Sequence, residues 1–161
     1  MAQAARRKTA PRKEDAVSLL KSDHEEVAKL FKKYENGEKK LSTPDKAALA
    51  KQICDALMVH TQIEEEIFYP ACHEQIRDVD DLLNEAKVEH QSLKELIAKI
   101  EQDRPGTEEY DAQVKVLGEY VTHHVNEEHK ELFPRARKSK MDLQTIGERL
   151  AVRKEELETT L

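Results

Sequence analysis

The sequence contains few residues that would break helices or cross-link the chain. Its 161 residues include four glycines, five prolines, two cysteines and no tryptophan. Long stretches without glycine or proline, rich in Lys, Glu, Leu and Ala, favour helices. Because 37% of the residues are charged, we expect amphipathic helices with solvated outer faces. A chain of this length can form one domain with a hydrophobic core.

Several classes of protein are disfavoured by what the sequence lacks. No stretch approaches the roughly 20 apolar residues that cross a bilayer, so we expect no membrane segment. A net charge of -6 argues against general nucleic-acid binding. Cys54 and Cys72 lack CxxC spacing and an export signal, which favours a cytoplasmic location with both thiols in the core. Residues 1–13 are basic, and we interpret them as a flexible, solvated tail.

The most informative feature is a motif that occurs twice. Residues 60–70 read His-Thr-Gln-Ile-Glu-Glu-Glu-Ile-Phe-Tyr-Pro, and residues 124–134 read His-Val-Asn-Glu-Glu-His-Lys-Glu-Leu-Phe-Pro. Each copy has a histidine, a glutamate four residues later, an aromatic residue, and a proline ten residues after the histidine. Two copies with one spacing indicate a common mechanism.

Apolar residues at intervals of three and four predict four long helices. The expected helices begin near Glu14, Thr43, Asp80 and Thr107, and Thr43 is expected to cap the second one. Pro70 should kink or loosen that helix near its end, because proline has no amide hydrogen to donate. Short loops between the helices favour an all-α, up-down-up-down four-helix bundle.

We expect residues 14–137 to form this bundle and residues 138–161 to add a C-terminal amphipathic helix. The amphipathic pattern runs over about 142–158, and Leu143, Ile146 and Leu150 offer a packing edge. Such a helix could be a lid or a dimer contact, and the pattern fits both.

Polar residues interrupt the inward apolar faces at six positions. They are His24, His60, Glu64, His90, His124 and Glu128. At about 1.5 Å of rise per residue, all six fall near the waist of the bundle. Buried carboxylates are tolerated when they are paired or coordinate a metal, and residues one turn apart share a helix face. We therefore predict a metal centre with mixed imidazole and carboxylate ligands, which suits a di-iron or di-manganese pair.

Other polar residues lie close to this pattern. His123 neighbours His124 and could replace or supplement it, although the ten-residue spacing to proline favours His124. His73 and His129 lie off the inward stripe, and we place them at the surface or behind a ligand. Three acids are interpreted as solvated helix charges and three tyrosines as core or rim residues: Glu65, Glu66, Glu127, Tyr34, Tyr69 and Tyr120.

The chain resembles hemerythrin-like proteins of the HHE cation-binding family. The resemblance rests on residues 23–26, 60–70, 89–93 and 124–134 and covers roughly residues 14–137. It implies a four-helix bundle that holds two non-haem iron ions with an oxo or hydroxo bridge. Carried over by position, the histidines are terminal ligands and the glutamates are bridges: His24, His60, His90 and His124, with Glu64 and Glu128.

Two positions depart from the oxygen-carrying members of that family. Those proteins have a second histidine one turn after the third-helix histidine, where this chain has Lys94. They also have an aspartate five residues after the fourth-helix histidine, where this chain has His129. A fifth imidazole is therefore missing or is replaced by His123, a tyrosine or solvent, which leaves more open coordination positions.

We therefore expect a protein that binds or reacts with oxygen, peroxide or nitric oxide at an open iron position, for sensing, scavenging or detoxification. If it is an enzyme, peroxide disproportionation is the expected reaction. The alternative is an iron storage, donation or iron–sulfur repair module without turnover. A third interpretation is a structural bundle that binds a protein partner through its N-terminal tail or C-terminal helix.

Overall fold

The computed structural model describes residues 13–161, so almost all of the expected basic tail lies outside the described residues. The described residues contain two π-helical turns, Glu64–Phe68 and Glu128–Leu132. The helices are α1 Ala16–Gly37, α2 Thr43–Ile63, α3 Tyr69–Gln75, α4 Asp80–Gln102, α5 Glu108–Glu127, α6 Phe133–Lys138 and α7 Leu143–Glu158.

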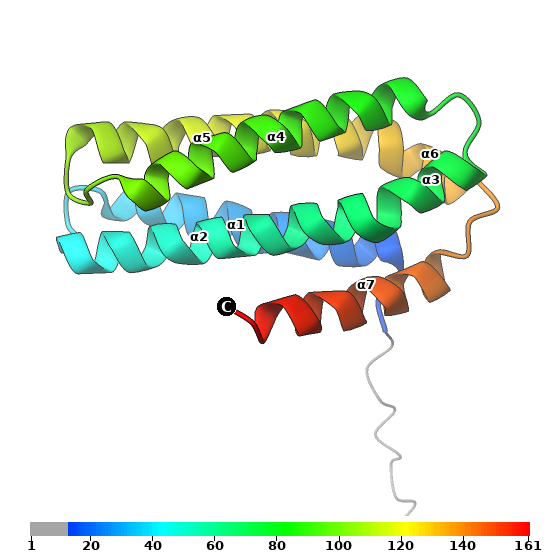
Figure 1. Ribbon diagram of the computed structural model, residues 1–161, viewed down its shortest axis with the longest axis horizontal. Helices are drawn as coiled ribbons and strands as arrows, with labels where there is room; N and C mark the ends of the chain where they lie inside the picture. The colour runs from blue at the N-terminus through cyan, green and yellow to red at the C-terminus, as the bar shows by residue number, and fades with distance from the viewer. Residues whose placement is uncertain (1–12) are drawn as a thin grey trace, which may run out of the picture.

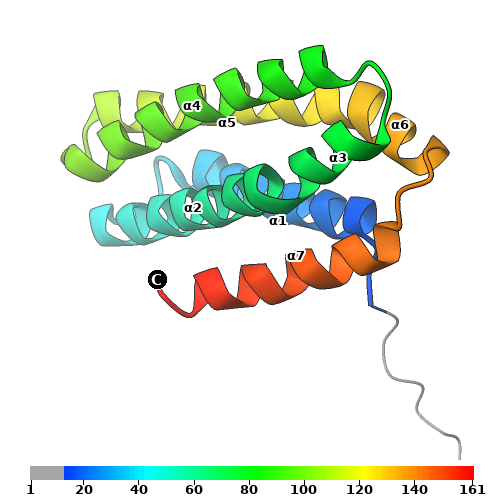
Figure 2. The same cartoon turned by 45° about the vertical axis from the view of Figure 1, so that its right-hand side comes forward.

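The four long helices run up, down, up and down (Figure 1). The hairpin of α1 and α2 packs against the hairpin of α4 and α5, and α7 lies along α1 and α2 on the outside of the bundle (Figure 2). The predicted all-α, up-down-up-down four-helix bundle with an additional C-terminal helix is thus confirmed.

Helices α1, α2, α5 and α7 begin at side chains that cap the backbone, whereas α4 has no side-chain cap among the described residues. Asp15, Thr107 and Asp142 each accept a hydrogen bond from the amide three residues later. Helix α2 is capped by Ser42, whose hydroxyl accepts from the amide of Asp45. The prediction of Thr43 as its cap was wrong by one residue, because Thr43 has already entered the helix. Such caps each contribute about 1 kcal/mol.

The disturbance expected at Pro70 is a π-helical turn, and the second motif proline follows a turn of the same kind. The amide of Tyr69, just before Pro70, donates to the carbonyl of Glu64, five residues back. The amide of Phe133, before the second proline, donates in the same way to Glu128. In a regular helix the proline ring would clash with the carbonyl four residues earlier, and the wider turn relieves this crowding. Each motif glutamate therefore begins a π turn.

Two apolar clusters fill the bundle, one on each side of its polar waist. The first includes Val17, Leu20, Phe68, Phe133 and Leu150, which belongs to α7. The second includes Val27, Ile53, Leu57, Leu93 and Leu117. Both cysteines are buried and free, as expected: Cys54 in the second cluster and Cys72 in the first. Within residues 13–161, none of the helices is both long enough and apolar enough to span a bilayer.

Helix α7 approaches the start of α1 at a glycine. A Cβ atom on Gly147 would lie 2.6 Å from the carbonyl oxygen of Glu14 and 2.7 Å from the amide nitrogen of Ala16. These are backbone atoms, which cannot rotate away. The same face of α7 buries Ile146 and Leu150. Helix α7 therefore packs on its own bundle with no room for a larger residue at this crossing.

We expect Gly147→Ala to lower the free energy of unfolding by roughly 1–3 kcal/mol, because the added methyl group overpacks the crossing of α7 and α1. Chemical denaturation measures this. Gly118→Ala is the control, since its Cβ would face the movable side chain of Phe31 at 3.2 Å and should cost less. Equal stability of Gly147→Ala and the wild type would contradict this packing of α7.

Candidate metal centre

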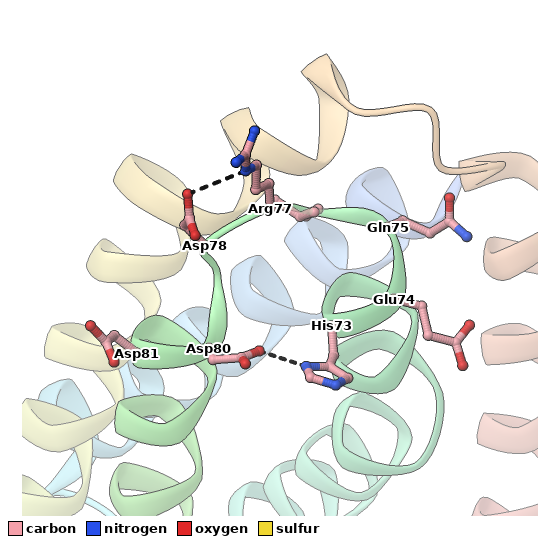
Figure 3. A pocket seen from close by; sticks show the side chains of 8 residues that line it. His73, Glu74, Gln75, Arg77, Asp78, Asp80 and Asp81 are labelled. Carbon is pink, nitrogen blue, oxygen red and sulfur yellow. Dashed lines mark hydrogen bonds and ion pairs between the residues drawn. The ribbon is translucent and has the colours of Figure 1, made fainter.

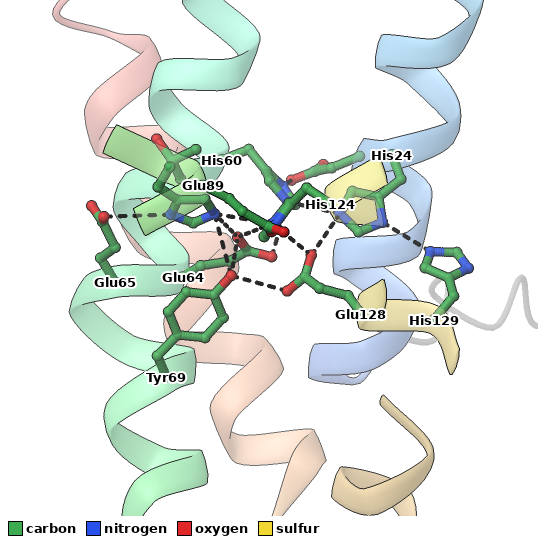
Figure 4. Close-up of polar contacts among 12 residues, drawn as sticks. His24, His60, Glu64, Glu65, Tyr69, Glu89, His124, Glu128 and His129 are labelled. Atoms are coloured by element: carbon green, nitrogen blue, oxygen red, sulfur yellow. Dashed lines mark hydrogen bonds and ion pairs between the residues drawn. The ribbon is translucent and has the colours of Figure 1, made fainter. Parts of the chain in front are cut away.

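All six inward polar residues meet at the waist of the bundle. Figure 4 labels His24, His60, Glu64, His124 and Glu128 among them. Four helices supply one histidine each, and the two π turns supply the glutamates at their first positions. Every side chain is buried, with 0–7% of each residue exposed. The six residues, in chain order, are His24, His60, Glu64, His90, His124 and Glu128. The structure brings them together, and their role as ligands stays a prediction.

The histidines form two pairs. The Nε2 atoms of His24 and His60 are 3.0 Å apart, and those of His90 and His124 are 3.1 Å apart. Each pair comes from one helical hairpin. The nitrogen atoms of each pair thus converge on one point, which is the arrangement needed for two imidazoles to share one ion.

The two glutamates span the histidine pairs. Glu64 places Oε1 3.0 Å from Nε2 of His60 and Oε2 3.1 Å from Nε2 of His90. Glu128 places Oε1 3.3 Å from Nε2 of His24 and 3.2 Å from Nε2 of His124. Each carboxylate therefore contacts one histidine from each pair, as a bridging ligand would.

Carboxylates behind the motif histidines orient them. Nδ1 of His60 lies 3.0 Å from Oδ2 of Asp23, and Nδ1 of His124 lies 2.5 Å from Oε2 of Glu89. A proton donated at Nδ1 leaves Nε2 with a lone pair directed at the centre, which is how metal-bound imidazoles are commonly held. Neither acid was predicted to belong to the site.

The other two histidines have different neighbours. Nδ1 of His24 is 2.9 Å from Nε2 of His129. Nδ1 of His90 lies 3.4 Å from Oε1 of Glu65 but makes no hydrogen bond to the residues that the structure describes. The other oxygen of Glu65 accepts a 2.6 Å hydrogen bond from Lys94. The interpretation of Glu65 as a solvated charge was therefore wrong, because it lies between a lysine and an inward histidine.

These outer contacts follow the internal repeat. The acid just before each lone histidine contacts the motif histidine of the same half. The residue just after each motif glutamate contacts the lone histidine of the other half. The four contacts are Asp23 to His60, Glu89 to His124, Glu65 to His90, and His129 to His24. Asp23 and Glu89 could have been found from the sequence, because each directly precedes a lone histidine, His24 or His90.

The two halves differ at the aromatic residue before each proline. The hydroxyl of Tyr69 lies 3.1 Å from an oxygen of Glu64, 3.1 Å from one of Glu128 and 3.2 Å from Nε2 of His90. Its counterpart Phe133 stacks on His24, with ring centroids 5.8 Å apart. Tyr69 is buried as expected, but its hydroxyl reaches the centre. Burial and the two carboxylates raise the pKa of this phenol well above its usual value.

The carboxylates control the charge of the imidazoles. Burial lowers the pKa of His60, but the neighbouring Glu64 and Asp23 carboxylates raise it to about 10. Burial likewise lowers the pKa of His124, whereas Glu128, Glu64 and Glu89 raise it to about 12. The cause is the same in both cases, because buried negative charge favours a nearby positive charge. Protons on these histidines balance the carboxylates when no other cation does.

The donors of the centre fit a metal cation. Among the described residues, Oε1 of Glu64 and Oε1 of Glu128 are buried without a hydrogen-bond partner. Buried carboxylate oxygens need compensation, and these two face the Nε2 atoms that converge from the histidines. Donor atoms within 4.8 Å of one another form two groups that share Glu64: one with His24, His60 and Glu128, the other with His90 and His124.

A small cavity adjoins this cluster. Its volume is about 10 Å³, and its lining includes His24, His60 and His124 together with apolar side chains of Val27, Leu57, Leu93 and Val121. That volume accommodates about one water-sized molecule. The apolar lining belongs to the second apolar cluster, whereas Tyr69 belongs to the first.

The remaining histidines lie outside the centre. The side chain of His123 is 65% exposed and lies 3.3 Å from Glu89 and 3.4 Å from Glu127, so His124 is the one that points inward. His73 lines an open surface hollow at the turn between α3 and α4 and contacts Asp80 (Figure 3). The side chains around it are polar and exposed, which places His73 at the surface.

A four-helix bundle with a buried histidine–glutamate cluster defines a class of metal-binding helical proteins. Residues 15–136 match the family model of the hemerythrin HHE cation-binding domain, and the chain belongs to this family, whose domain binds cations. It is similar to the crystal structure of a hemerythrin HHE cation-binding domain-containing protein from Mycobacterium kansasii, with a TM-score of 0.77 and 22% identity over 91% of this chain and 89% of that one. A comparison with curated proteins found no match.

We expect the metal-free protein to lose stability as the pH rises from about 6.5 toward 10. The pKa of His60 is about 10 in the folded chain against an ordinary value of 6.5, so its stabilising proton is held below the ordinary pKa and lost as the pH passes the folded one. Protein loaded with a divalent cation should not show this loss, because metal-bound imidazoles are already deprotonated.

Urea unfolding at about pH 6.5 and about pH 9.5, with and without chelator, measures the difference. Comparing loaded with metal-free protein at each pH removes the contribution of groups away from the centre. Equal stability of the metal-free protein at both values would contradict the proton-balanced cluster.

Proposed function

We propose that this chain binds two non-haem iron ions and uses them to bind or react with oxygen, peroxide or nitric oxide, for sensing, scavenging or detoxification. His24 and His60 would bind one ion, His90 and His124 the other, and the two glutamates would bridge them. The convergence of each histidine pair supports this assignment, as does the contact of each carboxylate with both pairs.

The donor set favours iron as the metal. Sites with two histidines, carboxylate oxygen and open positions suit non-haem iron, and here each histidine pair adjoins shared carboxylates. Bound iron would supply the redox change that oxygen or peroxide chemistry needs. Lys94, at the position where oxygen carriers have a further histidine, contacts Glu65 instead of the centre. This supports an open position for a ligand.

The small apolar cavity beside His24, His60 and His124 is the main support for a small ligand. At about 10 Å³, it holds about one water-sized molecule, which favours a ligand of very few atoms over an organic substrate. Burial of all six candidate ligands also argues against iron donation as the main role, since an acceptor would have to reach the ions. If the protein is an enzyme, peroxide disproportionation is the reaction we propose.

The proposed functional unit is residues 14–137, with residues 138–161 as an addition to it. We also propose that the protein works in the cytoplasm, where a reducing environment suits two buried, free cysteines.

Anaerobic iron loading, metal analysis and optical spectra test the metal assignment. We expect about two irons per chain, as in di-iron helical bundles, and loss of iron in His60→Ala or Glu128→Ala because each removes a donor. His73→Ala is the matched control, since this histidine is at the surface. Fewer than about one iron per chain in the wild type would contradict the di-iron assignment.

Addition of peroxide to the loaded protein then tests the function. Consumption of peroxide by loaded but not metal-free protein would support turnover. Transfer of iron to an apo acceptor without peroxide consumption would instead select the storage or donation alternative.

We expect Tyr69→Phe to keep both ions but to shift the optical spectrum and slow the reaction with peroxide by about 10–100-fold. The lost hydroxyl orients both glutamates and His90, and removing such outer contacts typically has an effect of this size. Tyr34→Phe is the control, because the Tyr34 hydroxyl bonds Asp111 away from the centre. An unchanged spectrum and rate would rule out a role for the Tyr69 hydroxyl.

A further inference from the structure

The C-terminal helix contacts the back of the metal centre. Nζ of Lys154 on α7 donates a 2.6 Å hydrogen bond to Oδ1 of Asp23, and Nδ1 of His60 lies 3.0 Å from Oδ2 of the same carboxylate. Asp23 is 6% exposed and has one oxygen on each partner. A continuous polar path thus leads from α7 through α1 to a candidate ligand on α2.

Lys154 supplies a positive charge to the buried carboxylate of Asp23. A buried carboxylate needs a paired positive charge, and the ammonium group of Lys154 lies 2.6 Å from Oδ1 of Asp23. Because the lysine occupies Oδ1, the carboxylate is held with Oδ2 toward His60. Without the ammonium group, Asp23 would have one partner and more freedom to rotate. The lysine therefore pairs with the buried charge and fixes the orientation of the acid behind His60.

The neighbouring residue of α7 contacts the π turn that carries Glu64. The guanidinium of Arg153 lies 2.7 and 3.2 Å from the two carboxylate oxygens of Glu66. Glu66 was interpreted as a solvated charge, and this pairing corrects that interpretation. Two consecutive residues of α7 thus contact the supports of two candidate ligands, the acid behind His60 and the turn that begins at Glu64.

In the part of the chain that the structure describes, no hydrogen bond or ion pair joins α7 to the acids behind His90 and His124, and the lysine that contacts Glu65 there is Lys94 of α4. Glu89, the counterpart of Asp23, contacts the exposed His123 on its outer side rather than a lysine. Glu127 also lies near His123. The repeat therefore generates an acid behind each motif histidine, whereas α7 acts on only one of them.

We propose that α7 is a positioning element of the metal centre, in which Lys154 acts through Asp23 to set the metal affinity at the His24–His60 position. This inference rests on the proposed binding of two metal ions. Lys154 is a positioning residue, since it bonds to Asp23 and contacts no candidate ligand. The role of α7 is thus to tune one position of the pair, in addition to covering the bundle.

Stepwise metal titration of the full chain tests this proposal, with anaerobic Fe²⁺ as the probe. In Lys154→Met we expect one of the two ions to bind about 10–100-fold more weakly, the usual effect of losing an outer contact, and the other to bind as in the wild type. Lys154→Arg should restore the affinity, because it keeps a cation beside Asp23. Lys154 is partly exposed, so the variants should fold, and circular dichroism checks this.

Two controls separate positioning from general stability. Arg137→Met removes a surface ion pair with Asp15 that lies away from the centre, and it should leave both affinities unchanged. In an Asp23→Asn background, Lys154→Met should have no further effect, because the two residues act through one contact. Equal weakening of both ions, additive effects in the double variant, or a lower unfolding temperature with unchanged affinities would each overturn the proposal.

The outcomes distinguish this inference from the proposed function. If the wild type fails to bind two ions, the proposed function fails and this inference with it. If the wild type binds two ions and Lys154→Met binds both with unchanged affinity, only the role of α7 is overturned.

Discussion

Two carboxylates buried among four imidazoles determine much of this structure. Glu64 and Glu128 are 0% and 3% exposed, and negative charge at that depth requires a nearby positive charge. Protons on His60 and His124 can provide it, and so can metal cations, which compete for the same nitrogen lone pairs. The acids behind the histidines fix which nitrogen faces the centre. The fold therefore maintains a binding-competent cluster by electrostatic balance as much as by apolar packing.

The repeat supplies this cluster from two similar hairpins, and its deviations make the halves unequal. At equivalent positions of the repeat, Tyr69 corresponds to Phe133 and Glu65 corresponds to His129. Of the two acids behind the motif histidines, only Asp23 bonds to a lysine of α7. Each difference changes the charge or hydrogen bonding around one histidine pair. A pseudo-symmetric bundle can in this way give two neighbouring metal positions different properties.

Periodicity and repeated spacing predicted the helices and the six inward residues, because both depend on which face of one helix a residue occupies. The outer contacts could not be predicted in the same way. Asp23 and Glu89 reach Nδ1 atoms on other helices, which depends on how the helices are rotated. Glu65 was misjudged because a π turn changes the direction of side chains after Glu64. The prolines indicated a disturbance of the helix but not its form.

The cavity beside the histidines also limits the size of the molecule that can bind next to them. Its lining comes from α1, α2, α4 and α5, and its volume is about 10 Å³. We therefore expect a molecule larger than water to bind there only when these helices separate locally. Such openings have their own free energy, which is independent of the chemistry inside. For a series of oxidants of increasing size, the rate of reaction would then depend on how often the helices open locally rather than on the reactivity of the centre.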